Sequence, residues 1–176
     1  MQEFLEEEED IAREQDAEPT KVSAKVFEIP IYQIALSKAL LLNENDTLLS
    51  AVNLMQANKI GAVIIVNKKK ELTGIITERD IILKGLAKNK NWQEIPVKNL
   101  MSPKPFSLHR EDPLVLAMHN MHIGGYRNIP ILDNDGKIES LITIQNVMKY
   151  LMDQFPVEID NIIDEPFTGE HIREGA

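Results

Sequence analysis

The sequence predicts a mixed α/β (α+β) fold in which two βαββα repeats pack about a pseudo-twofold axis. The first observation is an internal repeat, because residues 28–82 align with residues 94–148 at a constant shift of 66 and without a gap. The second is that helix-like and strand-like apolar patterns recur at the same places in both copies. Identical positions in the two copies are Glu28/Glu94, Ile29/Ile95, Pro30/Pro96, Lys38/Lys104, Leu42/Leu108, Asp46/Asp112, Leu48/Leu114, Ala51/Ala117, Met55/Met121, Ile65/Ile131, Ile76/Ile142 and Thr77/Thr143.

Each copy first predicts an amphipathic helix, because apolar residues recur at the i, i+3, i+4 and i+7 spacing of one helix face. These positions are Leu48, Ala51, Val52 and Met55 in the first copy and Leu114, Ala117, Met118 and Met121 in the second. Asp46 and Thr47 begin the first helix. For the second helix, Asp112 is the predicted N-cap and Pro113 the first helical residue.

A β-hairpin and a second helix follow in each copy. The predicted elements are strands at 62–66 and 128–132, polar turns at 67–70 and 133–136, strands at 72–77 and 138–143, and helices at 78–87 and 144–153. Each repeat buries only one face of a small sheet, so the two repeats are expected to pack against each other.

Charge divides the chain into a centre and two tails. Residues 1–20 hold nine acids and one base, residues 156–176 hold six acids and one base, and the centre holds 17 bases and 13 acids. The acidic run 6–10 predicts a disordered N-terminal segment. The expected division is an acidic tail at 1–24, a first repeat at 25–90, a second repeat at 91–155 and an acidic tail at 156–176. A mildly basic centre suits a small anionic ligand.

Several classes of protein are excluded by what the sequence lacks. Without cysteine there are no disulfides, thiolate zinc sites or cysteine nucleophiles. The apolar run 61–66 is too short to span a bilayer, and the acidic start has the wrong charge for a secretory signal. No basic stripe with interleaved aromatic residues indicates nucleic-acid binding. We therefore expect a cytoplasmic protein with neither a membrane nor a nucleic-acid partner.

Catalysis is not predicted either. No phosphate-binding loop or nucleophile motif occurs. His119 and His122 have a spacing that can bind a metal ion, but no third ligand is fixed nearby in the sequence, so we interpret them as surface histidines. We expect a non-enzymatic protein without a metal cofactor.

Candidate chemistry lies where the second strand of each copy turns into a helix. The first junction reads Gly74-Ile75-Ile76-Thr77-Glu78-Arg79-Asp80, and the second reads Ser140-Leu141-Ile142-Thr143-Ile144-Gln145-Asn146. Thr followed three residues later by Asp or Asn is typical of a helix-capping box. The same helix start offers free N–H groups to a phosphate, and a carboxylate there can accept hydrogen bonds from ribose hydroxyls. Both interpretations remain open, and they are compatible.

The doubled Gly-hydrophobic-hydrophobic-Thr-x-x-Asp pattern within matching flanks resembles the CBS domain, named after cystathionine beta-synthase, from about Lys25 to Phe155. The resemblance implies a flat tandem module with two clefts, which often bind AMP, ADP, ATP, S-adenosylmethionine or another adenosyl ligand. It also implies a homodimer formed through the helices. Apolar residues on the last helices suit either that interface or the core: Ile81, Ile82, Leu83, Val147, Met148 and Leu151.

Carried onto this sequence, the resemblance implies that Asp80 and Asn146 face ribose hydroxyls and that Thr77 and Thr143 lie by the ribose or phosphate. A wall of the second cleft would come from the strand entered through Tyr126, Arg127, Asn128, Ile129 and Pro130, with Arg127 paired to a phosphate. Val63 and Ile129 would then sandwich the adenine.

The junctions also differ. Ser140 replaces Gly74, Asn146 replaces Asp80, and Arg127 replaces Gly61, so the sequence predicts unequal clefts. The first has the better ribose motif and the second the better phosphate cation.

Three more cations have two interpretations. Arg79 can reach a phosphate or be a solvated helix residue, and Lys38 and Lys104 can line the cleft mouths or lie on exposed loops. The expected function is a ligand-sensing module that signals through its conformation or assembly to a separate effector protein. The alternative is a dimerisation scaffold whose clefts bind no ligand.

Overall fold

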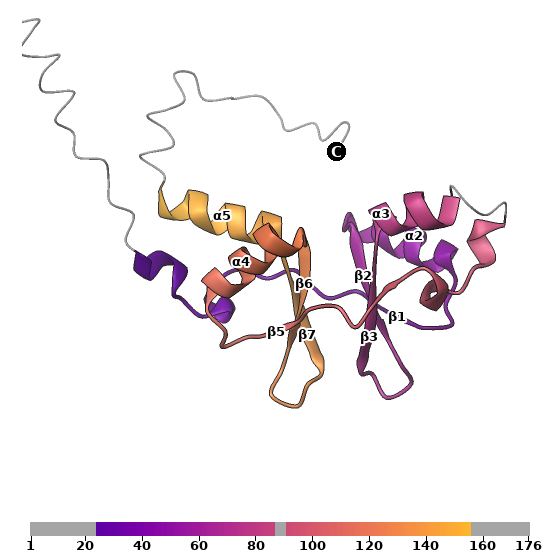
Figure 1. The fold of residues 1–176 in the computed structure, drawn as a ribbon, viewed down its shortest axis with the longest axis horizontal. Coiled ribbons are helices and arrows are strands. Elements are labelled where there is room, and N and C mark those ends of the chain that lie inside the picture. The colour runs from indigo at the N-terminus through magenta and orange to yellow at the C-terminus, as the bar shows by residue number, and fades with distance from the viewer. Residues whose placement is uncertain (1–23, 87–90, 156–176) are drawn as a thin grey trace, which may run out of the picture.

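A computed structural model describes residues 24–86 and 91–155. Two α/β units lie side by side with their sheets facing each other, their helices at one end and their hairpin turns at the other (Figure 1). This arrangement confirms the predicted fold of two repeated units. The predicted tails at 1–24 and 156–176 fall almost entirely outside the described residues.

The first half of the chain contains the elements η1 (Ala24–Phe27), η2 (Ile31–Gln33), β1 (Leu41–Asn43), α2 (Leu48–Asn58), β2 (Ala62–Val66), β3 (Leu72–Thr77), α3 (Glu78–Asp80) and η3 (Ile81–Leu86). The second half contains η4 (Trp92–Glu94), η5 (Val97–Asn99), β4 (Ser102–Pro103), β5 (Leu108–His109), α4 (Leu114–Gly124), β6 (Asn128–Leu132), β7 (Ile138–Thr143) and α5 (Ile144–Gln154). The four hairpin strands have the predicted bounds. One sheet has the order β1-β2-β3-β4 and the other β5-β6-β7.

The two hairpin turns share a left-handed residue. Lys70 has φ 64° and Gly136 has φ 75°. Each strand pair also shifts register beside its turn, at Ile65/Val66 and at Ile131/Leu132. The backbone geometry is thus repeated, although glycine supplies the left-handed conformation only in the second turn.

The helix boundaries require two corrections. Pro113 is the N-cap of α4 rather than its first residue, and the Asp112 side chain accepts a hydrogen bond from His109 N instead of capping the helix. The last helix of the first unit was predicted as one helix at 78–87. It begins as α3 and continues as the π-helix η3, whereas its counterpart α5 is α-helical throughout.

Each unit is completed by a leading segment that comes from the other predicted repeat: residues 95–103 in the first unit and residues 29–37 in the second. Ile31 N donates to Asp112 O at 2.9 Å and Leu114 N donates to Ile29 O at 2.8 Å, which ties the N-terminal segment to the second unit. The equivalent bonds, from Val97 N to Asp46 O and from Leu48 N to Ile95 O, tie residues 95–97 to the first unit. The repeats at 25–90 and 91–155 therefore exchange segments, which links the two units firmly.

Three apolar clusters hold this arrangement together. One lies under the helices of the second unit and includes Ile31 and Ile34; another lies under those of the first unit and includes Val97. The third joins the two sheets, through residues that include Ile64 of β2 and Leu141 of β7. Because β2 is buried on both faces, it lies at the centre of the molecule.

The leading segments differ in register where they meet the hairpins. Ser102 lies opposite Ile75 in the first unit, whereas Ser37 lies opposite Leu141 in the second. Since Ile31 corresponds to Val97, the N-terminal segment contains one more residue before this pairing than its counterpart does. The gapless sequence alignment conceals this slip. The two units are back in the same register at β1 and β5, which pair with β2 and β6 through equivalent residues.

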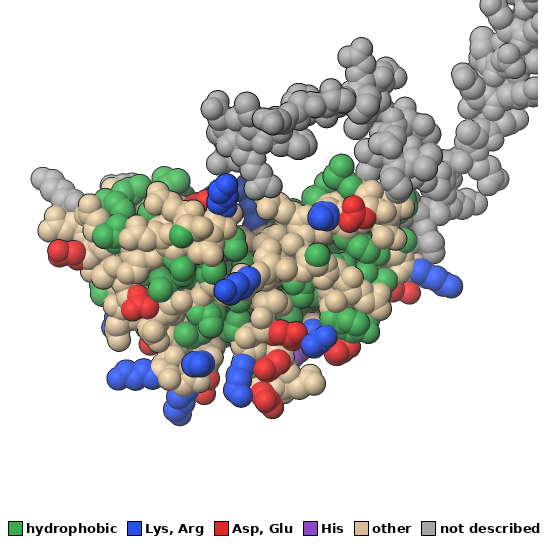
Figure 2. Space-filling view, turned by 180° about the vertical axis from the view of Figure 1, so that it is seen from behind, with side chains coloured by type: hydrophobic (Ala, Val, Ile, Leu, Met, Phe, Trp, Pro, Cys, Tyr) green, Lys and Arg blue, Asp and Glu red, His purple; other side chains and the backbone are tan. Residues whose placement is uncertain are grey.

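Charged and apolar side chains are unevenly distributed on the surface. Many charged residues gather toward the hairpin-turn end, and hydrophobic side chains, with some charged ones among them, reach the surface at the helical end of the molecule (Figure 2). Within the described residues, no helix is both long enough and apolar enough to cross a membrane.

Candidate functional site at the strand-to-helix junctions

Both junctions form the predicted capping box. Thr77 Oγ1 accepts from Asp80 N at 3.3 Å, and the Asp80 carboxylate accepts from Thr77 N at 3.0 Å. The bonds between Thr143 and Asn146 measure 3.2 and 2.8 Å. Each Thr hydroxyl also donates to the Asp or Asn side chain at 2.8 Å. The capping interpretation is confirmed, and only the other side-chain atom of Asp80 or Asn146 is left for a ligand.

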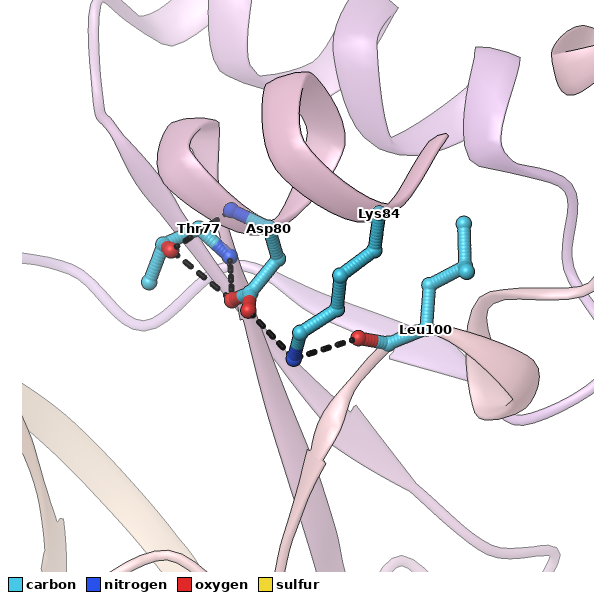
Figure 3. A network of polar contacts seen from close by, with 4 residues as sticks. All are labelled: Thr77, Asp80, Lys84 and Leu100. Carbon is cyan, nitrogen blue, oxygen red and sulfur yellow. Dashed lines mark hydrogen bonds and ion pairs between the residues drawn. The ribbon is translucent and has the colours of Figure 1, made fainter. Parts of the chain in front are cut away.

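At the first junction, Lys84 occupies that remaining position. Its Nζ lies 2.6 Å from Asp80 Oδ1 and donates to Leu100 O at 3.1 Å (Figure 3). The side chain of Asp80 is only 12% exposed. Lys84 therefore neutralises the buried carboxylate and spans the space between the helix and the leading segment.

The motif glycine of the first junction makes room for a neighbouring side chain. A Cβ atom at Gly74 would lie 2.8 Å from Met101 Cγ. Met101 packs on the first core, so its thioether covers the strand just before the junction. The absence of a side chain at Gly74 thus makes room for Met101 within the protein.

The second junction is open. Asn146 Oδ1 accepts from Thr143 and from Ser37 Oγ, the latter at 3.2 Å. Because Thr143 N can only donate, this oxygen is assigned and the Asn146 amide group points its N–H donors elsewhere. Tyr150, the counterpart of Lys84, donates from its hydroxyl to Val26 O at 3.1 Å rather than bonding to Asn146.

A cavity of about 200 Å³ lies between α5 and the N-terminal segment at this junction. Its walls are formed by Gln33, Ile34, Ala35, Asn146, Lys149, Tyr150, Asp153 and Gln154. Ile34 corresponds to Leu100, whose carbonyl binds Lys84 in the first unit. The cavity therefore occupies the side of the helix that Lys84 bridges at the other junction.

The other side of each junction differs in charge. The first residues of the two helices donate to Gly61 O and Arg127 O at 3.1 and 2.9 Å, so these two positions are equivalent. A Cβ atom at Gly61 would lie 2.7 Å from Glu78 Oε2, which places an acid over this position in the first unit. The equivalent position in the second unit is Arg127, which is exposed and does not line the cavity.

Three apolar site residues need correction. Val63 and Ile129 are 0% exposed and belong to the cores beneath the helices, and Pro130 is also buried. Fully buried side chains offer no surface to an adenine ring, so the expected sandwich is not supported. A strand buried on both faces conceals from the sequence which of its residues reach a cleft.

Among the remaining predicted residues, Tyr126 is 45% exposed and stacks on Phe106 with ring centroids 6.3 Å apart. Arg79, Lys38 and Lys104 are exposed, and none of them lines the cavity. Of the predicted site residues, the structure thus brings Asn146 to the cavity, with Thr143 hydrogen-bonded to it and Arg127 across the junction.

Sequence reasoning missed the residues that distinguish the junctions. Lys84 follows Asp80 by four residues, a spacing at which helical charges pair, and this signal was available. No sequence signal marked Gln33, Lys149 or Asp153, because the cavity that they line forms only where the exchanged N-terminal segment packs beside α5. In the described part of the chain, no group of three or more His, Cys, Asp or Glu side chains is placed to hold a metal ion.

The apolar residues of the last helices separate into two groups. Ile81 and Val147 are buried and Leu151 is partly buried, whereas Ile82, Leu83 and Met148 are 56%, 52% and 51% exposed. The former belong to the cores, and the latter lie on the surface.

The family model for the CBS domain matches residues 31–86 and 97–153, more than half of the chain. A protein of Methanopyrus kandleri is 29% identical over 121 residues, which cover 69% of this chain and 62% of that protein. The Arabidopsis thaliana CBS domain-containing protein CBSCBSPB5 is 32% identical over 114 residues, or 65% of this chain and 21% of the relative. The match therefore spans less than two thirds of the length of these relatives.

Two solved structures share the fold. The CBS domain pair of protein MJ0100, in complex with 5′-methylthioadenosine and S-adenosyl-L-methionine, has a TM-score of 0.64 at 21% identity and covers 71% of this chain and 97% of that one. CBSX2 in complex with AMP has a TM-score of 0.61 at 18% identity and covers 72% and 98%. With two matched repeats that pack in this way, the chain belongs to the CBS-domain family as a tandem pair.

Proposed function

We propose that this chain is a non-catalytic regulatory module that binds an adenosyl ligand at its second junction. The observation that carries the proposal is the cavity lined by Asn146, whose amide N–H groups are not used in the capping box. The adenosyl compounds in the MJ0100 and CBSX2 complexes support the ligand class.

The ribose would lie at Asn146, with the roles of donor and acceptor reversed from the sequence-based expectation. Since Asn146 Oδ1 already accepts from Thr143 and Ser37, the amide nitrogen donates to a ribose hydroxyl oxygen. Arg127 supplies positive charge on the other side of the junction.

The first junction would not bind a ligand. Lys84 satisfies the Asp80 oxygen that a ribose would need, and a ligand would have to break this ion pair and the bond to Leu100 O. Leaving a buried carboxylate unpaired costs about 1–3 kcal/mol or more. One ligand per chain follows.

Differential scanning fluorimetry with AMP, ADP, ATP, S-adenosylmethionine, S-adenosylhomocysteine and 5′-methylthioadenosine tests the proposal. A ligand at a hundred times its dissociation constant stabilises the folded state by about 2.7 kcal/mol, which raises the melting temperature by several degrees. If none of these compounds raises it, adenosyl binding is wrong.

The signal would pass through assembly and through a separate effector protein. Ile144, Met148 and Met152 form an exposed apolar stripe at i, i+4 and i+8 along α5, and Ile82 and Leu86 occupy the equivalent positions in the first unit. We infer that a second copy covers these helices in a homodimer.

Sedimentation velocity tests the dimer. The double variant Ile82→Lys/Met148→Lys places charge in the middle of the stripe and is expected to sediment as a monomer, whereas the hairpin-turn variant Lys68→Ala is expected to stay dimeric. A wild-type chain that is monomeric at micromolar concentration contradicts the inferred dimer.

The scaffold function remains the second candidate, because the same exposed stripe supports assembly without any ligand. It is favoured if the chain dimerises and no adenosyl compound binds.

A further inference from the structure

We infer that the cavity beside α5 is a subsite for a zwitterionic substituent, so that the preferred ligand is a nucleoside carrying an α-amino-acid group rather than one carrying phosphate groups. This inference rests on the proposed function and specifies its ligand class.

The size of the cavity indicates that it holds only part of a ligand. At about 200 Å³ it is smaller than the roughly 300–1,000 Å³ typical of a site that encloses a whole small molecule. Several of its lining residues follow Asn146 along α5. If the ribose lies at Asn146, a substituent attached to the ribose therefore reaches the cavity by extending along this helix.

The charges on the cavity wall select the substituent. Lys149 and Asp153 are four residues apart on one face of α5, and neither forms an ion pair with another described residue. Lys149 can bind a carboxylate and Asp153 an ammonium group, while the amides of Gln33 and Gln154 supply further donors and acceptors. A group that carries both charges matches both side chains.

A polyphosphate matches this wall poorly. It would bring at least two negative charges beside Asp153, and like charges in a half-enclosed site repel. Arg127 does not offset this repulsion, because it is not one of the residues that line the cavity.

The first unit offers an internal contrast. The residues at the positions of Lys149 and Asp153 are Leu83 and Ala87, so the pair of opposite charges occurs only beside the open junction. The charged pair and the cavity therefore coincide in one unit.

Isothermal titration calorimetry of the full chain with three probes tests the inference. S-adenosylhomocysteine carries the amino-acid group, 5′-methylthioadenosine is a matched nucleoside that lacks it, and AMP carries a phosphate. We expect S-adenosylhomocysteine to bind about tenfold or more tightly than either of the others. Lys149→Met and Asp153→Asn are each expected to weaken its binding about fivefold or more and to leave 5′-methylthioadenosine unchanged, and Lys137→Met is the control for net charge.

The outcomes separate this inference from the proposed function. Equal affinity for S-adenosylhomocysteine and 5′-methylthioadenosine, or tighter binding of AMP, overturns the zwitterion subsite and leaves adenosyl binding intact. Binding of S-adenosylhomocysteine that is insensitive to both variants also overturns it. If none of the three probes binds, the proposed function fails as well.

Discussion

The two strand-to-helix junctions share one backbone motif and differ in what fills the space beside it. Each Thr caps its helix with nearly the same bond lengths. At the first junction Lys84 binds the Asp80 carboxylate and Met101 packs over Gly74, whereas at the second Tyr150 bonds to Val26 O and lines a cavity beside Asn146. The comparison shows that the signature residues specify the helix start, and that their neighbours decide whether a ligand can bind there.

The largest effect is expected from the packing of Gly74 against Met101. Gly74→Ser should destabilise the fold by about 1–3 kcal/mol, because its Cβ overlaps Met101. Met101→Ala should cost about 1–3 kcal/mol through lost packing. In urea denaturation, the double variant is expected to lose less free energy of unfolding than the sum of the losses of the two single variants. Strict additivity would show that the two residues do not constrain each other.

A smaller effect is expected from the polar contacts. Lys84→Met leaves the nearly buried Asp80 carboxylate unpaired, so we expect a loss of about 1–2 kcal/mol, limited because the Lys84 side chain is 42% exposed. Tyr150→Phe removes one neutral hydrogen bond, at about 0.5–1.5 kcal/mol. A larger loss for Tyr150→Phe than for Lys84→Met, measured by urea denaturation, would reverse this ranking.

The smallest effect concerns the hairpin turns. Lys70→Gly is expected to stabilise the fold by about 0.5 kcal/mol, because it relieves a left-handed lysine. Gly136→Ala should destabilise it by a similar amount or more. The melting temperatures of both variants check this pair, and a change of the same sign in both would contradict it.

The sequence predicted the hairpins and the capping boxes correctly because these depend on local pattern and turn chemistry. It could not show that residues 29–37 pack on the second unit, since this exchange is set by contacts between distant segments. The one-residue slip at Ser37 and the cavity between α5 and the N-terminal segment were hidden for the same reason. Val63 and Ile129 were misplaced because apolar alternation is lost in a strand buried on both faces.

The most direct test of unequal junctions exchanges their distinguishing residues. Asn146→Asp/Tyr150→Lys gives the second junction the ion pair of the first while keeping an acceptor for the cap, and Asp80→Asn/Lys84→Tyr makes the reverse change. Calorimetry with the tightest-binding adenosyl compound should give one site per wild-type chain, no binding at that site in the first variant, and the wild-type affinity at that site in the second. Two equal sites in the wild type, or a site lost on changing Asp80 and Lys84, would contradict the account.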